Sequence, residues 1–295
     1  MLVRRNTIVF ILVFMASFCA TYAQSTLHAI IVVKTEDTAR EFPSDPKPAW
    51  KLSMQKIEDE LDRVEVHTDL NIQKHYFVGT HFDKSALLDG IDDLQIGEDD
   101  VLWFYFAGHG YGDRDCKYPN MVVSRKKDAN GNKLYISSEE AHVSLSSCDI
   151  QDVLIRKNAR LTIGLYETCN YYTKDSKGDS GYVINAQAEE NYKVLFEEAK
   201  GYVFITASKN GQYAGWNTEV GGYFTHWFLE RLHYYLRQES IKPCDWYTVG
   251  ASTIGKLKAY TAARPEEFDK PQILYGAVEI VDENGIEIDC RKTKN

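Results

Sequence analysis

The apolar run VLWFYFA, at residues 101–107, restricts the fold of this chain more than any other segment. Every position in it is apolar, which is the pattern of a strand that is covered on both faces. The run has the length of a strand, and the acidic turn GEDD precedes it. Strands of this kind occur in parallel sheets with helices on either side. The run therefore predicts an α/β domain.

Strand-like and helix-like segments alternate along the rest of the chain, as a parallel sheet requires. We see no linker that would separate two domains. We therefore expect one three-layer sandwich, in which a mostly parallel sheet of about six strands carries helices on both faces. The expected strands are 27–33, 71–79, 101–107, 159–169, 201–208 and 271–276, and the expected helices are 50–64, 84–94, 147–157, 188–199, 221–236 and 248–262. Hairpins are expected to turn at Asn130 and Gly131 and, in the tail 278–295, near Asn284 and Gly285.

The first 23 residues have the pattern of a secretory signal peptide. Arg4 and Arg5 precede an apolar stretch, and TYA provides a small-residue cleavage site after Ala23. The alternative is an uncleaved anchor, but residues 7–23 fall short of the ~20 that span a bilayer. We expect a secreted or otherwise extracytoplasmic protein with no membrane insertion after cleavage. The mature domain would be 24–277, followed by the tail 278–295.

The net charge limits the partners. The chain carries a formal charge of −9, and loss of Arg4 and Arg5 with the leader would make it more negative. Such a surface repels nucleic acid and anionic membranes, so neither is expected as a partner. Basic peptides are compatible with it.

Cysteine usage leaves two alternatives open. Without Cys19 the chain has an odd number of cysteines, although it is expected to leave the reducing cytosol. Either four pair and one remains a free thiol, or all are reduced. Their spacing matches no zinc motif, so no metal site is expected. The five are Cys116, Cys148, Cys169, Cys244 and Cys290.

Two residues stand out at the expected strand ends. His109 follows the apolar strand between Gly108 and Gly110, and Cys169 ends the strand LTIGLYE. Carboxyl ends of parallel strands meet at one edge, so imidazole and thiol would face one cleft. A thiolate attacks carbonyl carbon, and a histidine protonates the departing amine. The backbone amides of Gly110 and Cys169 would stabilise the oxyanion. The alternative, two buried core residues, leaves the Gly-His-Gly turn unexplained.

These motifs resemble those of the caspase and metacaspase peptidases. FYFAGHG is similar to their Y-x-S-G-H-G motif, and LYETC is similar to D-x-C. The resemblance implies a caspase fold, with His109 as general acid/base, Cys169 as nucleophile and no required third acid. It extends roughly from Leu27 to Gly276. Further similar segments follow in the same order, namely FITASKNGQYA, GGYFTHWFLERL and KPQILYG.

Departures from the family motifs bear on specificity. Glu167 stands where metacaspases have an Asp that helps to bind Arg or Lys, whereas caspases have a neutral Gln there. The resemblance therefore favours cleavage after a basic residue, since a carboxylate pairs strongly with guanidinium. Asp113 and Asp115 either add to this pocket or belong to a solvated loop. Residues 170–172 replace the family's His-Ser-Gly, so the pocket loop differs.

Other functions remain open. Legumain and its transamidase relatives share the Gly-His-Gly and acid-x-Cys pattern and favour Asn. A catalytically silent caspase-like protein would bind peptides, but the intact Cys/His pair speaks against it. Calcium activates many metacaspases, yet the loop DSKGD at 175–179 has too few carboxylates for a calcium site, so no cofactor is expected. The oligomeric state is not readable from the sequence.

Overall fold

The computed structural model of the chain describes most of the expected domain. The predicted leader, the turn at Asn130 and Gly131, and the tail beyond Glu279 lie outside the described residues. Among the described residues, no helix is both long and apolar enough to cross a membrane. The described residues are 24–34, 47–79, 82–111, 118–125, 142–168, 171–172, 186–208, 214–237, 241, 245–263 and 276–279.

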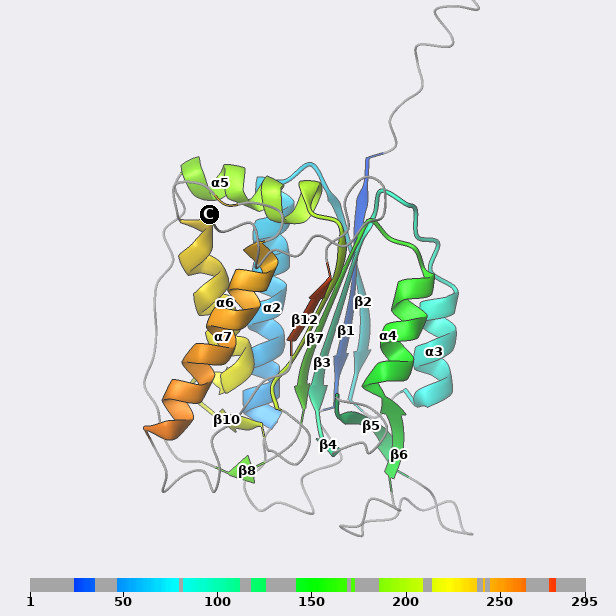
Figure 1. Cartoon of the computed structure of the whole chain (residues 1–295). Helices are drawn as coiled ribbons and strands as arrows, with labels where there is room; N and C mark the ends of the chain where they lie inside the picture. Colours follow the sequence, from blue (N-terminus) through cyan, green and yellow to red (C-terminus); the bar gives the residue numbers. More distant parts are fainter. Residues whose placement is uncertain are drawn as a thin grey trace, which may run out of the picture.

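A six-stranded sheet forms the middle layer (Figure 1), in the order β12-β9-β7-β3-β1-β2. Four neighbouring pairs are parallel, and β12 runs antiparallel to β9 at one edge. This confirms the predicted fold class, a mostly parallel sheet of about six strands. The strands are β1 (Thr26–Val33), β2 (Asn71–Val78), β3 (Val101–Gly108), β7 (Leu161–Thr168), β9 (Gly201–Thr206) and β12 (Gly276–Glu279).

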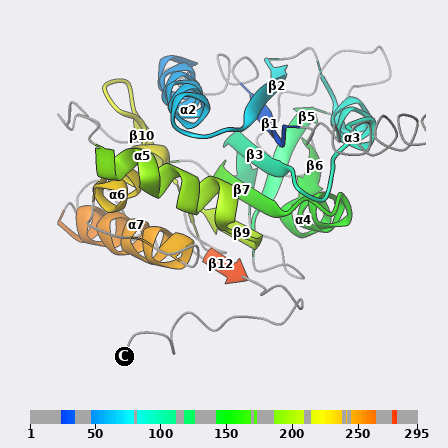
Figure 2. The same ribbon diagram turned by 90° about the horizontal axis from the view of Figure 1, so that it is seen from above.

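Helices cover both faces of the sheet (Figures 1 and 2), as predicted. Asp83 caps the helix α3 (Lys84–Asp92) by accepting a hydrogen bond from Ala86 N at 3.0 Å. One face carries α2 (Lys47–His67), α5 (Ala186–Lys193) with its π-helical continuation Val194–Glu198, α6 (Tyr223–Leu236) and α7 (Asp245–Ala262). The other face carries α3 (Lys84–Asp92) and α4 (Ser147–Arg156).

Strand β3 lies inside the sheet and has no exposed side. Because side chains alternate along a strand, Trp103 and Tyr105 join the core beneath α2 and α6. Phe104 and Phe106 join the core beneath α3 and α4. All four are fully buried, which explains the unbroken apolar run.

The structure corrects the expected elements at two places. Residues 278 and 279, predicted to belong to the tail, pair with β9 as part of β12, whereas 271–275 lie outside the described residues. Gly221 and Gly222 do not begin a helix but form the short strand β11, because Gly221 has a φ of +80° that an α-helix does not allow. The further short strands are β4 (Gly110–Tyr111), β5 (Asn120–Arg125), β6 (His142–Ser146), β8 (Tyr171–Tyr172) and β10 (Gly215–Asn217).

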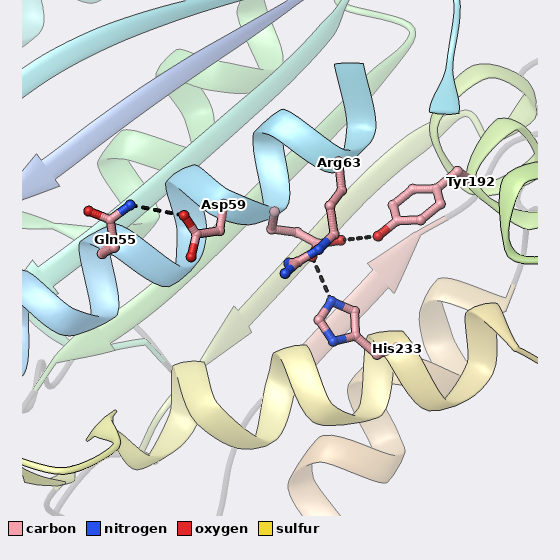
Figure 3. A network of polar contacts seen from close by, with 6 residues as sticks. Gln55, Asp59, Arg63, Tyr192 and His233 are labelled. Carbon is pink, nitrogen blue, oxygen red and sulfur yellow. Dashed lines mark hydrogen bonds and ion pairs between the residues drawn. The ribbon is translucent and has the colours of Figure 1, made fainter. Parts of the chain in front are cut away.

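A buried carboxylate joins three helices on the α2 side of the sheet (Figure 3). Glu60 of α2 is fully buried and accepts hydrogen bonds from Tyr192 Oη at 2.8 Å and Arg63 Nη1 at 3.0 Å. His233 Nε2 of α6 lies 2.6 Å from the same carboxylate. Burial by itself would raise the pKa of Glu60, but His233, Arg63 and Tyr192 together lower it below its ordinary value. The cluster therefore holds an ionised group inside the helical layer.

Replacement of Tyr192 by phenylalanine is expected to lower the free energy of unfolding by about 2 kcal/mol, because it removes a hydrogen bond to a buried charge. Urea unfolding at neutral pH measures this. The matched control is Tyr202→Phe, which removes a hydroxyl from a partly buried ring that stacks on Phe204. Its expected change is within about 0.5 kcal/mol. Equal changes in the two variants would contradict the role given to the Tyr192 hydroxyl.

Candidate active site

His109 lies at the carboxyl edge of the sheet, in the tight connection between β3 and β4. Its carbonyl accepts a hydrogen bond from Val122 N at 2.8 Å, and the next residue, Gly110, pairs with Met121 of β5. The imidazole is partly buried, and the indole of Trp50 meets it nearly at a right angle, with ring centroids 5.2 Å apart. The sequence prediction that His109 sits at this edge is confirmed.

Gly110 lies too close to β7 to carry a side chain. A Cβ atom there would lie 2.0 Å from Thr168 Oγ1 and 2.5 Å from the carbonyl oxygen of Asn120, far inside van der Waals contact. Glycine is therefore needed at this position because of close approach, and its φ is not positive. The missing side chain lets the His109 turn lie directly against the end of β7.

Strands β3 and β7 are parallel neighbours in the sheet. Their register pairs Gly108 with Thr168, so the residues that precede His109 and Cys169 are opposite each other. Ser208 Oγ donates to the carbonyl of Thr168 at 3.2 Å and anchors the end of β7 to the segment that follows β9. Cys169 itself lies outside the described residues. The dyad and the two oxyanion donors therefore remain predictions.

Glu167 is almost completely buried, with 4% of its surface exposed. It points to the first turn of α6, where its carboxylate accepts hydrogen bonds from Phe224 N at 3.2 Å and from the Thr225 hydroxyl. Tyr105 Oη donates to the same group at 3.3 Å. Burial raises the pKa of Glu167 to about 7, and these donors only partly oppose that effect.

Gly222 closes the space around this carboxylate. A Cβ atom at Gly222 would lie 1.7 Å from Glu167 Oε1. Gly222 is also the N-cap of α6 and has no side chain to bond the free amides, so Glu167 fills that role. Three donors already bond this carboxylate, namely Phe224 N, the Thr225 hydroxyl and Tyr105 Oη. Asp113 and Asp115 lie outside the described residues, so the basic pocket remains a prediction.

Comparison by sequence finds no relative: no protein-family profile and no curated protein matches the chain. Comparison by structure finds similar proteins. The crystal structure of caspase-1 from Spodoptera frugiperda superimposes with a TM-score of 0.50 over 86% of this chain and 88% of that chain. The fold is caspase-like. The resemblance inferred from FYFAGHG and LYETC is thereby confirmed for the fold, and at 11% identity the fold is what the comparison establishes.

The caspase-like fold carries at least one disulfide in this chain, because Cys148 in the first turn of α4 is disulfide-bonded. The alternative in which all cysteines are reduced is therefore wrong. Every other cysteine of the chain lies outside the described residues. Within the described part of the chain, no group of three or more His, Cys, Asp or Glu side chains could hold a metal ion. The loop 175–179 lies outside it.

Sequence reasoning missed the residues that surround this edge of the caspase-like fold. Trp50 and Ser53 come from α2, Tyr105 from β3 and Thr225 from α6. The helix expected at 50–64 includes Trp50 and Ser53, but a helical pattern does not reveal which side chain at the end of a helix meets the histidine. The i, i+3 spacing of Trp50 and Ser53 was the available signal, since it places both on one side of the helix.

Proposed function

We propose that this protein is a cysteine endopeptidase in which Cys169 is the nucleophile and His109 the general acid/base. The caspase-like fold supports a cysteine peptidase, and the observation that carries the assignment is local. The His109 turn packs against Thr168 at the end of β7, one residue before Cys169. The approach is so close that residue 110 has no room for a side chain. The presence of both His109 and Cys169 in the sequence speaks against a protein that only binds peptides.

The proposed reaction follows from these groups. His109 takes the proton of the Cys169 thiol, and the resulting thiolate attacks the scissile carbonyl carbon. The backbone amides of Gly110 and Cys169 donate hydrogen bonds to the oxyanion that forms. His109 gives a proton to the departing amine, which leaves a thioester on Cys169. His109 then takes a proton from the water that hydrolyses the thioester. Atoms and charges balance without a metal or a third catalytic acid.

Cleavage after Arg or Lys is the specificity that we propose. The acidic residue two positions before the cysteine supports it, as does the formal charge of −9 on the chain. Glu167 would provide the charge at the bottom of the pocket, with Asp113 and Asp115 as additional acids. Only the ionised carboxylate of Glu167 attracts a cationic Arg or Lys side chain. Because the pKa of Glu167 is about 7, the ionised fraction rises as the pH increases through neutrality.

A panel of amide reporters tests the proposal. The protein without residues 1–23 is incubated with reporters that end in Arg, Lys, Asn or Asp, before and after alkylation with iodoacetamide. We expect cleavage after Arg and Lys that alkylation abolishes. Cleavage after Asn alone would indicate the legumain-like alternative. No cleavage, together with an unreactive Cys169, would leave the silent peptide-binding protein.

We further propose that residues 1–23 are a cleaved leader and that the mature protein acts outside the cytoplasm. The pattern Arg4, Arg5, apolar stretch and TYA supports this. Mass spectrometry of the N-terminal peptide of the naturally produced protein is expected to find Gln24 as the first residue, or its cyclised form. A peptide that begins at or near Met1 would contradict it.

A further inference from the structure

We infer that Trp50 is a positioning residue that fixes the orientation of the His109 imidazole, an inference that rests on the proposed catalytic role of His109. Trp50 belongs to the first turn of α2 and is buried, with 2% of its surface exposed. Its ring meets the imidazole at 87° with centroids 5.2 Å apart, which is the geometry of an edge-to-face pair. Trp50 comes from a helix, whereas His109 sits in a turn.

The start of α2 is itself held in place at this edge. Ser53, one turn after Trp50, accepts a hydrogen bond from Gly222 N at 2.7 Å, and Lys56 Nζ donates to the carbonyl of Val220 at 3.0 Å. Both partners belong to the segment between β10 and α6. Gly221, between them, has space for no side chain, since a Cβ atom would lie 2.6 Å from Ser53 Oγ. Hydrogen bonds to the segment between β10 and α6 therefore hold the part of α2 that carries the indole.

The contacts of α2 with this segment extend to the end of β7. Gly222, whose amide donates to Ser53, packs against the carboxylate of Glu167, and Tyr105 Oη donates to that carboxylate at 3.3 Å. This face of α2 therefore lies against the ends of β3 and β7, the two strands that carry the predicted dyad. A shift of α2 would move the Trp50 ring relative to His109.

The expected effect of this contact is on rate more than on substrate binding. An imidazole can rotate about two side-chain bonds, and the edge-to-face contact with Trp50 favours the orientation that keeps the two rings paired. Small errors in the placement of a catalytic group cost up to ~10²-fold in rate. We therefore expect Trp50→Leu to lower kcat about tenfold or more while KM changes less than about threefold. Trp50→Phe keeps an aromatic ring at this position and is expected to recover most of the loss.

Trp103→Leu is the matched control. Trp103 is fully buried in the same core cluster, and its ring stacks on Phe196 with centroids 5.9 Å apart. Both leucine variants remove an indole from this core and are expected to lower the melting temperature. Only Trp50→Leu is expected to lower kcat. Equal kcat values for Trp50→Leu and wild type, or equal losses in the two leucine variants, would overturn the inference.

A second measurement is independent of activity. Diethyl pyrocarbonate modifies accessible neutral imidazoles, and peptide mapping gives the rate at His109. Because the Trp50 ring packs against the partly buried imidazole, Trp50→Leu is expected to raise this rate at least about threefold, with little change in Trp103→Leu. An unchanged rate would overturn the inference. If wild type cleaves no reporter, the proposed peptidase function fails, and the packing of Trp50 on His109 is then judged by this rate alone.

Discussion

Replacement of His109 by alanine is expected to lower kcat/KM at least about 10³-fold on the best basic reporter, because the thiol loses its base and the amine loses its proton donor. Cys169→Ala is expected to be at least as inactive. The kcat/KM of the double variant is expected to be no lower than that of the less active single variant, since the two residues act as one unit. Initial rates with purified protein, at matched folded concentration, measure all three.

The control for these variants is His67→Ala. His67 ends α2 far along the chain from Trp50, and its ring stacks on Tyr192 with centroids 5.1 Å apart. Loss of this ring is expected to leave kcat/KM within a factor of about three. A His109→Ala protein that retains activity within tenfold of wild type would contradict the dyad. The reporter panel would then have to be explained by another base.

Glu167→Gln is expected to remove the part of the pH dependence of the free energy of unfolding that comes from ionisation of Glu167. Burial raises the pKa of Glu167 in the folded protein to about 7 from an ordinary value of 4.5. Below about pH 4.5 the carboxyl is protonated in both states and contributes no difference. As pH rises from there through 7, the unfolded chain ionises first, so wild-type stability falls by about 3 kcal/mol. Glutamine cannot ionise and is expected to lose this decline.

The measurement is urea unfolding of wild type and Glu167→Gln at pH 5 and pH 8. The variant is expected to gain about 2–3 kcal/mol on wild type between these two pH values. The comparison is made between the two proteins because Glu60 has a lowered pKa and acts in the opposite direction. Its stabilisation is present above its ordinary pKa and is lost as pH falls. A difference between the proteins that does not change with pH would contradict the raised pKa of Glu167.

The same variant tests the proposed specificity. If the Glu167 carboxylate pairs with the cationic side chain of the substrate, Glu167→Gln is expected to change the specificity. The ratio of kcat/KM for the Arg reporter to kcat/KM for the Asn reporter is expected to fall about tenfold or more. Thr225→Val removes a hydrogen bond to that carboxylate without removing its charge, so it is expected to preserve the ratio. Equal losses on all reporters in Glu167→Gln would contradict the basic pocket. Glu167 would then serve only to hold the first turn of α6 against β7.

Local pattern was sufficient for the main elements of this fold. The run 101–107 predicted a strand buried on both faces, and β3 has that position. The helix expected at 84–94 corresponds to α3, which begins at Lys84 and is capped by the Asp83 side chain. The short strands β10 and β11 were missed, because two or three residues carry no periodicity and their pairing depends on distant segments.

The site divides in the same way. The sequence by itself determined that His109 follows a buried strand between two glycines and that an acid-x-Cys motif ends another, because such positions depend on local order along the chain. Only the tertiary structure decided that Glu167 turns toward the first turn of α6 and that Trp50 meets the imidazole of His109. The physical reason is that these contacts join residues from separate elements. Which side chains meet at the edge of a sheet depends on the register and packing of elements that are distant in the sequence.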